Sequence, residues 1–380
     1  MAGAVRQPID EKAFGKFLEE NQLIEREKVG IEHKKLTWRV GLQFGFGQSN
    51  PTYQITDASG HRYVMRKKPP GKLISKTAHK VEREYRALHA LEATDVAVPK
   101  TYCLCEDDSV IGTPFYIMEF LDGRIFEDFL MPESKSADER TALWKEAIQT
   151  LARLHAVDVK KVGLDKFGKA KGFYSRQTQT WATICISQSK AVDVETKEPV
   201  GQLPHFDELV GFFKNERLQP KDRATLVHGD YKIDNLVFHK TEPRVIGILD
   251  WEMSTIGHPL SDVCNFITQF YLARSPGTSA SSSSSGFLPG ATPGLPQPQD
   301  ILQWYTEISG YDPRPELSWG AAFNIFKLAG VCQGIAARVA ARQASSAKAK
   351  HHADTRGLLA EFAWVLAQEA RDSAQAEAKL

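Results

Sequence analysis

The chain has 380 residues, of which 42% are hydrophobic and 25% are charged, and these proportions exclude a wholly disordered, collagen-like or coiled-coil protein. The 48 Lys and Arg residues against 47 Asp and Glu give a net charge of +1, so the sequence predicts no overall affinity for nucleic acid or for an anionic membrane. The length predicts one large two-lobed domain or two medium ones.

Five scattered cysteines form neither a disulfide pattern nor a zinc-binding pattern, which favours a reducing, intracellular compartment. No apolar run reaches the roughly eighteen residues that a membrane-spanning helix needs, so we expect no membrane span. The N-terminus also lacks the apolar core of a secretory signal.

In the N-terminal third, apolar and polar residues alternate in several segments, as they do in strands. A helical stretch lies on either side of these segments. A glycine-rich stretch, residues 44–50, separates the first two strands. A further strand pair between residues 99 and 121 ends at Asp122-Gly123, and there we place the boundary between an N-terminal lobe (1–121) and a C-terminal lobe (122–380). The predicted elements before that pair are a helix within 10–29, strands over 36–42, 53–55 and 63–65, and a helix over 76–93.

We predict that the remaining chain is mainly helical. Its first helix lies over 138–157, where apolar residues recur every three or four positions and so form one face. Residues 275–299 are rich in Ser, Pro and Gly, and we expect a flexible insertion that buries no core. The other predicted elements are short strands over 226–227, 236–238 and 245–249, and helices over 301–308, 316–343 and 355–370.

The most informative stretch lies between residues 228 and 252. There His228-Gly-Asp-Tyr-Lys-Ile-Asp-Asn235 is followed by Leu249-Asp-Trp-Glu252. An Asp five residues before an Asn, with a second Asp on the next strand, is the arrangement with which phosphotransferases accept a hydroxyl proton and hold magnesium. We therefore predict Asp230 as the catalytic residue and Asn235 and Asp250 as magnesium ligands. The alternative interpretation is a tight turn that the Asp and Asn side chains cap.

A kinase also needs groups that bind ATP, and the N-terminal lobe offers them at the required places. Arg66 is the best candidate for the cation on the third strand, with Lys67 and Lys68 as alternatives, and Glu84 on the next helix is its predicted partner. A hairpin turn and a solvated basic strand end are the alternative interpretations. The predicted nucleotide-binding residues are Gly45, Gly47, Ser49, Asn50, Arg66, Glu84, Glu119 and Leu121.

The motif at 228–252 resembles the aminoglycoside phosphotransferase and choline kinase superfamily. Strings at residues 47–53, 66–72, 110–116 and 251–262 are similar to one branch, the kinase-like domain fused to acyl-CoA dehydrogenase family members ten and eleven. The resemblance implies an α+β, protein-kinase-like, two-lobed fold, with a small antiparallel-sheet N-lobe and a larger, mainly helical C-lobe. It also implies ATP and Mg²⁺ as cofactors. Arg66 departs from the many superfamily members that have Lys there, although Arg also neutralises phosphate.

The resemblance further implies transfer of the γ-phosphate of ATP to the hydroxyl group of a 4-hydroxyacyl-CoA in fatty-acid breakdown. The alternatives are a kinase of another small alcohol, such as an aminoglycoside or choline, and a pseudokinase that binds nucleotide or acyl-CoA. The presence of all three motif residues disfavours the pseudokinase. A basic and aromatic segment, residues 169–190, is expected to form a substrate wall that suits an anionic acceptor better than a polycationic antibiotic. The alternative interpretation is a solvated helix start with a few buried aromatic residues.

The C-terminal tripeptide Ala378, Lys379, Leu380 is similar to a peroxisomal address. We therefore expect a peroxisomal import receptor as a partner and a peroxisomal, otherwise cytoplasmic, localisation. Acyl-CoA oxidation in peroxisomes would agree with the substrate that the family resemblance implies.

Overall fold

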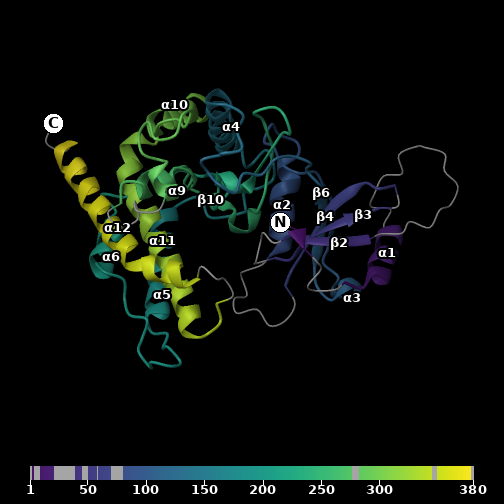
Figure 1. Cartoon of the computed structure of the whole chain (residues 1–380), viewed down its shortest axis with the longest axis horizontal. Coiled ribbons are helices and arrows are strands. Elements are labelled where there is room, and N and C mark those ends of the chain that lie inside the picture. Colours follow the sequence, from purple (N-terminus) through teal and green to yellow (C-terminus); the bar gives the residue numbers. More distant parts are fainter. Residues whose placement is uncertain are drawn as a thin grey trace. The chain divides into compact units, whose positions relative to one another are not determined.

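The computed structural model of the protein describes residues 2–3, 9–20, 39–44, 50–57, 59–69, 80–275, 282–344 and 349–377 (Figure 1). The predicted nucleotide-binding residues Gly45, Gly47 and Ser49 and the C-terminal residues 378–380 lie outside this part of the chain. Contacts divide the chain into two units. Unit 1 is Met1–Ile125, Lys160–Leu164 and Asp234–Ser254; unit 2 is Phe126–Val159, Asp165–Ile233 and Thr255–Leu380.

This division differs from the single predicted boundary after residue 121, because the segment Asp234–Ser254 returns to unit 1. Phe238 and Arg124 exchange two backbone hydrogen bonds of 2.7 and 2.8 Å, and Ile248 donates its N–H to the carbonyl of Ala97 over 3.0 Å. These bonds hold the hairpin that follows the catalytic motif within the strand-rich unit.

Unit 1 is built on a six-stranded antiparallel sheet with the strand order β1-β2-β3-β4-β6-β5. An antiparallel sheet in this part of the chain is as predicted. The strands are β1 (Ala2–Gly3), β2 (Arg39–Phe44), β3 (Thr52–Thr56), β4 (Arg62–Lys67), β5 (Thr101–Cys105) and β6 (Phe115–Glu119), and the helices are α1 (Glu11–Glu20), α2 (Val81–Leu91) and α3 (Asp108–Ile111).

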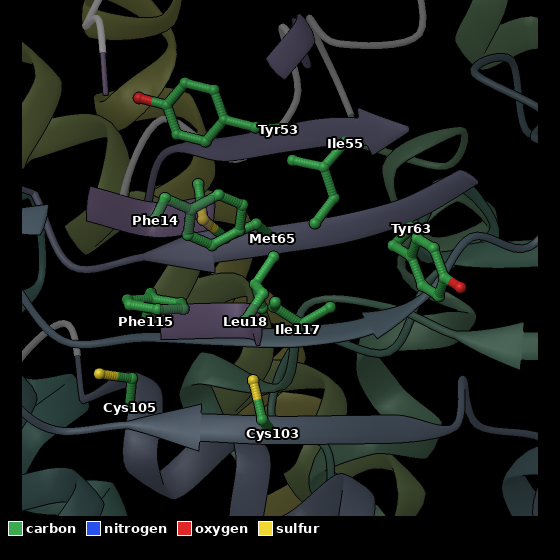
Figure 2. Close-up of a cluster of buried hydrophobic side chains, with 10 residues drawn as sticks. All are labelled: Phe14, Leu18, Tyr53, Ile55, Tyr63, Met65, Cys103, Cys105, Phe115 and Ile117. Carbon is green, nitrogen blue, oxygen red and sulfur yellow. The ribbon is translucent and has the colours of Figure 1, made fainter. Parts of the chain in front are cut away.

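Figure 2 shows the hydrophobic core on one face of this sheet, where alternate residues of four strands gather. Two residues of α1 that are one helical turn apart complete it. Residues of the opposite parity, Arg66 and Tyr116, contact Glu84 of α2 instead. The core residues are Phe14, Leu18, Tyr53, Ile55, Tyr63, Met65, Cys103, Cys105, Phe115 and Ile117.

The rest of the described chain is mainly helical, and the helix that ends it, α12, packs along α11 (Figure 1). The predicted short strands correspond to β7, β8 and β9. The strand β10 and the helices α6 to α9 were not predicted, and a helix start within residues 169–190 was only an alternative interpretation. The helices are α4 (Ala137–Ala156), α5 (Phe173–Ser189), α6 (Phe206–Lys214), α7 (Leu260–Phe266), α8 (Thr268–Leu272), α9 (Ser282–Ser285), α10 (Pro298–Ser309), α11 (Leu317–Ala340) and α12 (Ala349–Glu377). The strand pairs are β7 (Thr225–Val227) with β10 (Thr255–Gly257) in unit 2, and β8 (Leu236–Phe238) with β9 (Val245–Ile248) in unit 1. Single 3-10 turns are η1 (Ile233–Asn235), η2 (Trp251–Met253) and η3 (Arg314–Glu316).

One stretch of the described chain, Arg314–Ala340, is long and apolar enough to cross a membrane by length and composition. Its most apolar window is 72% buried within the protein, as is usual for the central helix of a helical core. The apolar character of α11 is therefore accounted for by packing.

The expected flexible insertion at 275–299 does contribute to the core over its described part. Phe287 is 5% exposed, and its ring centroid lies 5.1 Å from that of Phe270 and 6.4 Å from that of Trp144. Thr141 of α4 donates to the carbonyl of Gly294 over 2.8 Å. The prediction of an insertion that buries no core is therefore wrong for residues 282–299, because one aromatic side chain anchors an otherwise polar segment.

Candidate active site

Arg66 is the centre of an ion-pair cluster in unit 1. The strand register places it between Thr52 of β3 and Tyr116 of β6, and its side chain is 7% exposed. Burial lowers the pKa of Arg66, but the neighbouring carboxylates raise it above its ordinary value, so the guanidinium stays charged. Three carboxylates surround it: Glu84 at 2.8 Å, Asp250 at 2.6 Å and Glu252 at 3.8 Å. With all three ionised the cluster is net negative and can accept a further cation.

Glu84 is the buried carboxylate of this cluster, and it is 1% exposed. Asn50 donates to its Oε1 over 2.6 Å, and the hydroxyl of Tyr116 donates to its Oε2 over 3.1 Å. The Arg66 Nε approaches Oε2 as an ion pair without hydrogen-bond alignment. Burial and the nearby carboxylates raise the pKa of Glu84 to about 7, against the opposing effect of Arg66. This carboxyl group therefore titrates near neutral pH.

Asn235 and Asp250 are brought together by the β8–β9 hairpin. Leu236 pairs with Ile248, and the N–H of Leu249 donates to the carbonyl of Asn235 over 2.8 Å. Asp250 adopts a left-handed φ of 65°, a conformation that costs a non-glycine residue about 1–3 kcal/mol and that clusters at functional sites. Its carboxylate meets Arg66, 184 residues away in sequence.

These two side chains fit the ligand set of a magnesium ion. Mg²⁺ prefers oxygen donors and is usually bound by one or two protein groups together with substrate phosphates. Asn235 offers an amide oxygen and Asp250 a carboxylate of which one oxygen, Oδ1, bonds to Arg66. No group of three or more His, Cys, Asp and Glu that could hold a metal alone is found in the part of the chain that the structure describes. A site of this kind depends on the phosphates to complete it.

The catalytic motif begins with a loop in unit 2, directly after β7. Gly229 has φ 88°, which only glycine adopts without strain, and this explains the glycine of the motif. The N–H of Asp230 donates to Nδ1 of His228 over 3.2 Å. The carboxylate of Asp230 is 38% exposed and lies 3.4 Å from the ammonium group of Lys232. It is thus an accessible carboxylate on a fixed loop.

Asp262 of α7 holds this loop in place. It is fully buried and accepts the backbone N–H groups of His228 and Gly229 over 2.7 and 2.8 Å. His155 lies 3.1 Å from the same carboxylate through Nε2, and its Nδ1 lies 2.7 Å from the hydroxyl of Tyr305. Burial acts to raise the pKa of Asp262, but the hydrogen bond and charge of His155 and the loop donors lower it below its ordinary value. Asp262 is therefore a positioning residue for the catalytic loop.

Comparison with known proteins agrees with this geometry. The model of the phosphotransferase enzyme family matches residues 40–281. The chain belongs to this family. It is 41% identical over 314 residues to a probable acyl-CoA dehydrogenase IBR3 of Arabidopsis thaliana, covering 78% of this chain and 36% of that protein. It is 39% identical over 294 residues to acyl-CoA dehydrogenase family member 11 of Mus musculus, covering 77% and 36%. This phosphotransferase chain thus spans about a third of the length of these curated relatives.

Solved structures confirm the predicted kinase-like fold, with its small antiparallel sheet and its mainly helical part. A putative aminoglycoside phosphotransferase of Ralstonia eutropha is 34% identical, with a TM-score of 0.75 over 95% of this chain and 99% of that chain. An ethanolamine kinase of Plasmodium vivax is 15% identical, with a TM-score of 0.57 over 94% and 95%. The second likeness shows the fold alone.

The remaining predicted nucleotide-binding residues of this phosphotransferase lie at the end of β6. The N–H of Glu119 donates to the carbonyl of Lys100 over 2.8 Å, and its side chain accepts from the N–H of Lys100 over 3.1 Å. The carbonyl of Leu121 accepts from Gly123 over 3.2 Å. The assignment of Glu119 and Leu121 to nucleotide binding stays a prediction.

The structure separates the candidate cations of β4. Lys67 is buried with its ammonium group 5.7 Å from the ring centroid of Tyr53, on the core face of the sheet. Arg66 has the opposite parity and reaches the carboxylates. Glu252, the third carboxylate, was not predicted as part of the site, although its place two residues after Asp250 was the available signal.

The first aromatic residues of the basic and aromatic segment 169–190 do not form part of the expected substrate wall. Phe173 and Tyr174 are buried, and Tyr174 packs edge-on against Trp319, with ring centroids 4.6 Å apart. Arg176 donates to the backbone carbonyls of Lys169 and Lys171 at the start of α5. The expectation is wrong for Phe173 and Tyr174, because an aromatic pair at a helix start packs into the helical core.

Proposed function

We propose that this phosphotransferase moves the γ-phosphoryl group of ATP to the hydroxyl group of a small molecule, a hydroxyacyl-CoA. The observation that carries the proposal is the Arg66 cluster. A permanently charged guanidinium is held by Glu84 and Asp250 in a net negative surrounding, and Asn235 lies beside Asp250 on the same hairpin. Magnesium–nucleotide chemistry needs such a cation, its helix carboxylate and a pair of oxygen donors.

The roles follow from these contacts. Arg66 binds the ATP phosphates, and Glu84 and Asn50 fix its orientation. Asn235 and Asp250 would hold Mg²⁺, which when bound neutralises charge on the phosphates. The backbone of Glu119 and Leu121 binds the adenine ring.

The transfer step balances without further reagents. The acceptor hydroxyl oxygen forms a bond to the γ-phosphorus while the bond from that phosphorus to the β–γ bridging oxygen breaks. ADP leaves with the electron pair of that bond, and Asp230 takes the hydroxyl proton. Such positioned proton transfer contributes roughly 10²- to 10⁴-fold to a rate.

The acceptor class has separate support. The curated relatives that this chain matches are named as acyl-CoA dehydrogenases, and this chain resembles their kinase-like part. A phosphorylated hydroxyacyl-CoA would be a substrate for a further enzyme that acts on acyl-CoA. Import into peroxisomes through Ala378, Lys379 and Leu380 belongs to the same proposal.

The test is product analysis by mass spectrometry. Purified protein is incubated with MgATP and, separately, a 4-hydroxyacyl-CoA, choline, ethanolamine and an aminoglycoside. We expect the mass of one phosphoryl group to be added to the acyl-CoA alone. Asp230→Asn should lower the rate at least roughly 100-fold and leave ATP affinity unchanged. Asp207→Asn, an exposed carboxylate of α6, is the matched control and should keep full activity.

Two results would contradict the proposal at different levels. Phosphorylation of choline, ethanolamine or the aminoglycoside in place of the acyl-CoA would overturn the acceptor class. ATP binding without transfer to any of these acceptors would favour a nucleotide-binding pseudokinase.

A further inference from the structure

One lysine of unit 2 has no partner, among the residues that the structure describes, that accounts for its position. Lys327 lies in the middle of α11 and is half-buried. It makes no ion pair or hydrogen bond with any residue that the structure describes. Removing an ammonium group from water is costly unless an acceptor replaces the water, so lysines are rarely buried without a partner. Its place in the helix therefore needs an explanation outside ordinary packing.

The face of α11 that carries Lys327 is fixed by contact with α7 and α8. Gly320, Asn324 and Lys327 follow helical spacing and share one face. A Cβ at Gly320 would lie 2.7 Å from the sulfur of Cys264, so the helices approach closely there. Asn324 donates to the hydroxyl of Thr268 over 2.7 Å. Lys327 is consequently directed along the face that meets α7.

α7 is also the helix that holds the catalytic loop. Asp262 accepts two backbone N–H groups just before Asp230, over 2.7 and 2.8 Å, and Asn265 donates to the carbonyl just after it, over 3.1 Å. Burial lowers the pKa of Lys327, whereas Asp262 and Asp230 raise it. The helix α7 therefore contacts both the helix that carries Lys327 and the loop that carries Asp230, and all three belong to unit 2.

We propose that Lys327 binds a carbonyl or carboxylate oxygen of the acceptor, next to the hydroxyl group from which Asp230 takes the proton. An ammonium group has three donors and no acceptor, so its ligand must supply oxygen lone pairs. A hydroxyacyl thioester carries such a carbonyl oxygen a few bonds from its hydroxyl group. This inference rests on the proposed phosphotransfer and names the part of the acceptor that is recognised.

The same lysine discriminates against the alternative acceptors. Choline, ethanolamine and aminoglycosides carry a positive charge close to the hydroxyl group. Two like charges at short separation in a partly buried site repel each other more strongly than in bulk water, because the effective dielectric constant is lower there. Lys327 therefore selects hydroxy-acid derivatives and excludes amino alcohols.

The test compares Lys327→Met, Lys327→Arg and Lys214→Met, the last being an exposed lysine of α6. We expect the KM for 4-hydroxyacyl-CoA to rise roughly 10- to 100-fold in Lys327→Met, the loss of one charge-assisted hydrogen bond. Lys327→Arg should stay within about tenfold of the unsubstituted protein, since the charge remains. The KM for ATP should be unchanged in all three. If Lys327→Met fails to fold, Lys327→Gln is measured in its place with the same expectation.

A binding experiment separates this inference from the proposed function. The N-acetylcysteamine thioester of a 4-hydroxy acid carries the hydroxyl and carbonyl groups without the phosphates of CoA. Its affinity, measured calorimetrically without ATP, should fall in Lys327→Met and stay unchanged in Lys214→Met, whether or not turnover is seen. Equal affinity in Lys327→Met, or an effect on the KM for ATP alone, would overturn the role of Lys327. Absence of turnover with this binding pattern intact would instead overturn the proposed phosphotransfer.

Discussion

Two carboxylates of this phosphotransferase are almost completely buried, one in each unit, and their pKa values move in opposite directions. Glu84 shares one guanidinium with two other carboxylates, and its pKa rises to about 7. Asp262 receives two backbone N–H groups and His155, and its pKa falls below the ordinary value. Burial acts to raise both values. The charges of Asp250 and Glu252 add to that effect at Glu84, whereas the donors and positive charge around Asp262 outweigh it, so the neighbouring charges decide the direction.

The difference separates a cluster of net negative charge from a carboxylate that its own donors stabilise. The Asp262 cluster has donors enough to stabilise its charge and does not need a further cation. The Arg66 cluster has an excess of carboxylates, and Asp250 and Glu252 remain 25% and 23% exposed. Under the proposed function, magnesium and nucleotide would complete the Arg66 cluster. The Asp262 cluster fixes the loop that carries Asp230.

The largest effect that would test the comparison comes from Asp262→Ala. The change leaves two buried backbone N–H groups and His155 without their acceptor, so we expect the free energy of unfolding to fall by about 3–5 kcal/mol. Denaturant unfolding at neutral pH measures it. Asp207→Ala on the exposed face of α6 is the control. A loss below about 1 kcal/mol would contradict the view that these donors depend on Asp262.

The variant Arg66→Met tests the ion-pair cluster around Arg66. We expect ATP affinity to fall roughly 100-fold, because a charge-assisted contact to phosphate is lost. Lys67→Met on the core face should leave the affinity within about threefold, because Lys67 faces Tyr53. Equilibrium nucleotide binding on both variants measures the contrast, and the reverse ranking would assign the phosphate contact to Lys67.

The pH dependence of stability sharpens the comparison through Glu84→Gln. With a native pKa of about 7 against an ordinary value near 4.5, Glu84 stays protonated in the folded chain while it ionises in the unfolded one. The folded state therefore binds more protons between about pH 4.5 and 7, and this group lowers stability as the pH rises through that window. Glu84→Gln should remove about 3 kcal/mol of that decline, whereas Glu82→Gln on the same helix should not.

Asp262 gives the opposite sign. Its native pKa is below the unfolded value, so its contribution is fully present above about pH 4 and is lost as the pH falls through the folded pKa. Unfolding free energies measured from pH 3 to 8 on the Glu84→Gln variant should therefore still fall at the acid end. If the slope of the unfolding free energy against pH near neutrality is unchanged in Glu84→Gln, Glu84 is ionised in the folded protein.

The smallest expected effect concerns single hydroxyl groups. Tyr305→Phe removes the partner of His155 Nδ1 and should cost about 1 kcal/mol of unfolding free energy. Tyr116→Phe removes a donor from Glu84, so it should raise the pKa of that carboxyl group further. Near neutral pH, we expect the slope of the unfolding free energy against pH to change in Tyr116→Phe and to stay the same in Tyr305→Phe. This is the expected difference between the two clusters.

Much of the fold follows from local pattern. Alternation over 53–55 and 63–65 predicted the strands β3 and β4 of the sheet, and the observed register sends Met65 to the core and Arg66 to the opposite face. Patterns failed where a single residue overrides composition, as Phe287 does in a segment of Ser, Pro and Gly. The helix α5 begins with Phe173 and Tyr174, which belong to the core, so the alternative interpretation of a helix start with buried aromatics applies there in place of the substrate wall.

The sequence by itself determined the order of the motif: a carboxylate at Asp230, which is the proposed base, an amide at Asn235 and a carboxylate at Asp250, with spacings that short strands and tight turns impose locally. Tertiary structure alone decided which charges meet. Arg66 reaches Asp250 across 184 residues, and Asp262 joins His155 across 107. No local period encodes such contacts, because they depend on how sheet and helices pack. The same packing sets burial, and burial together with the available donors fixes the charge state of each carboxylate.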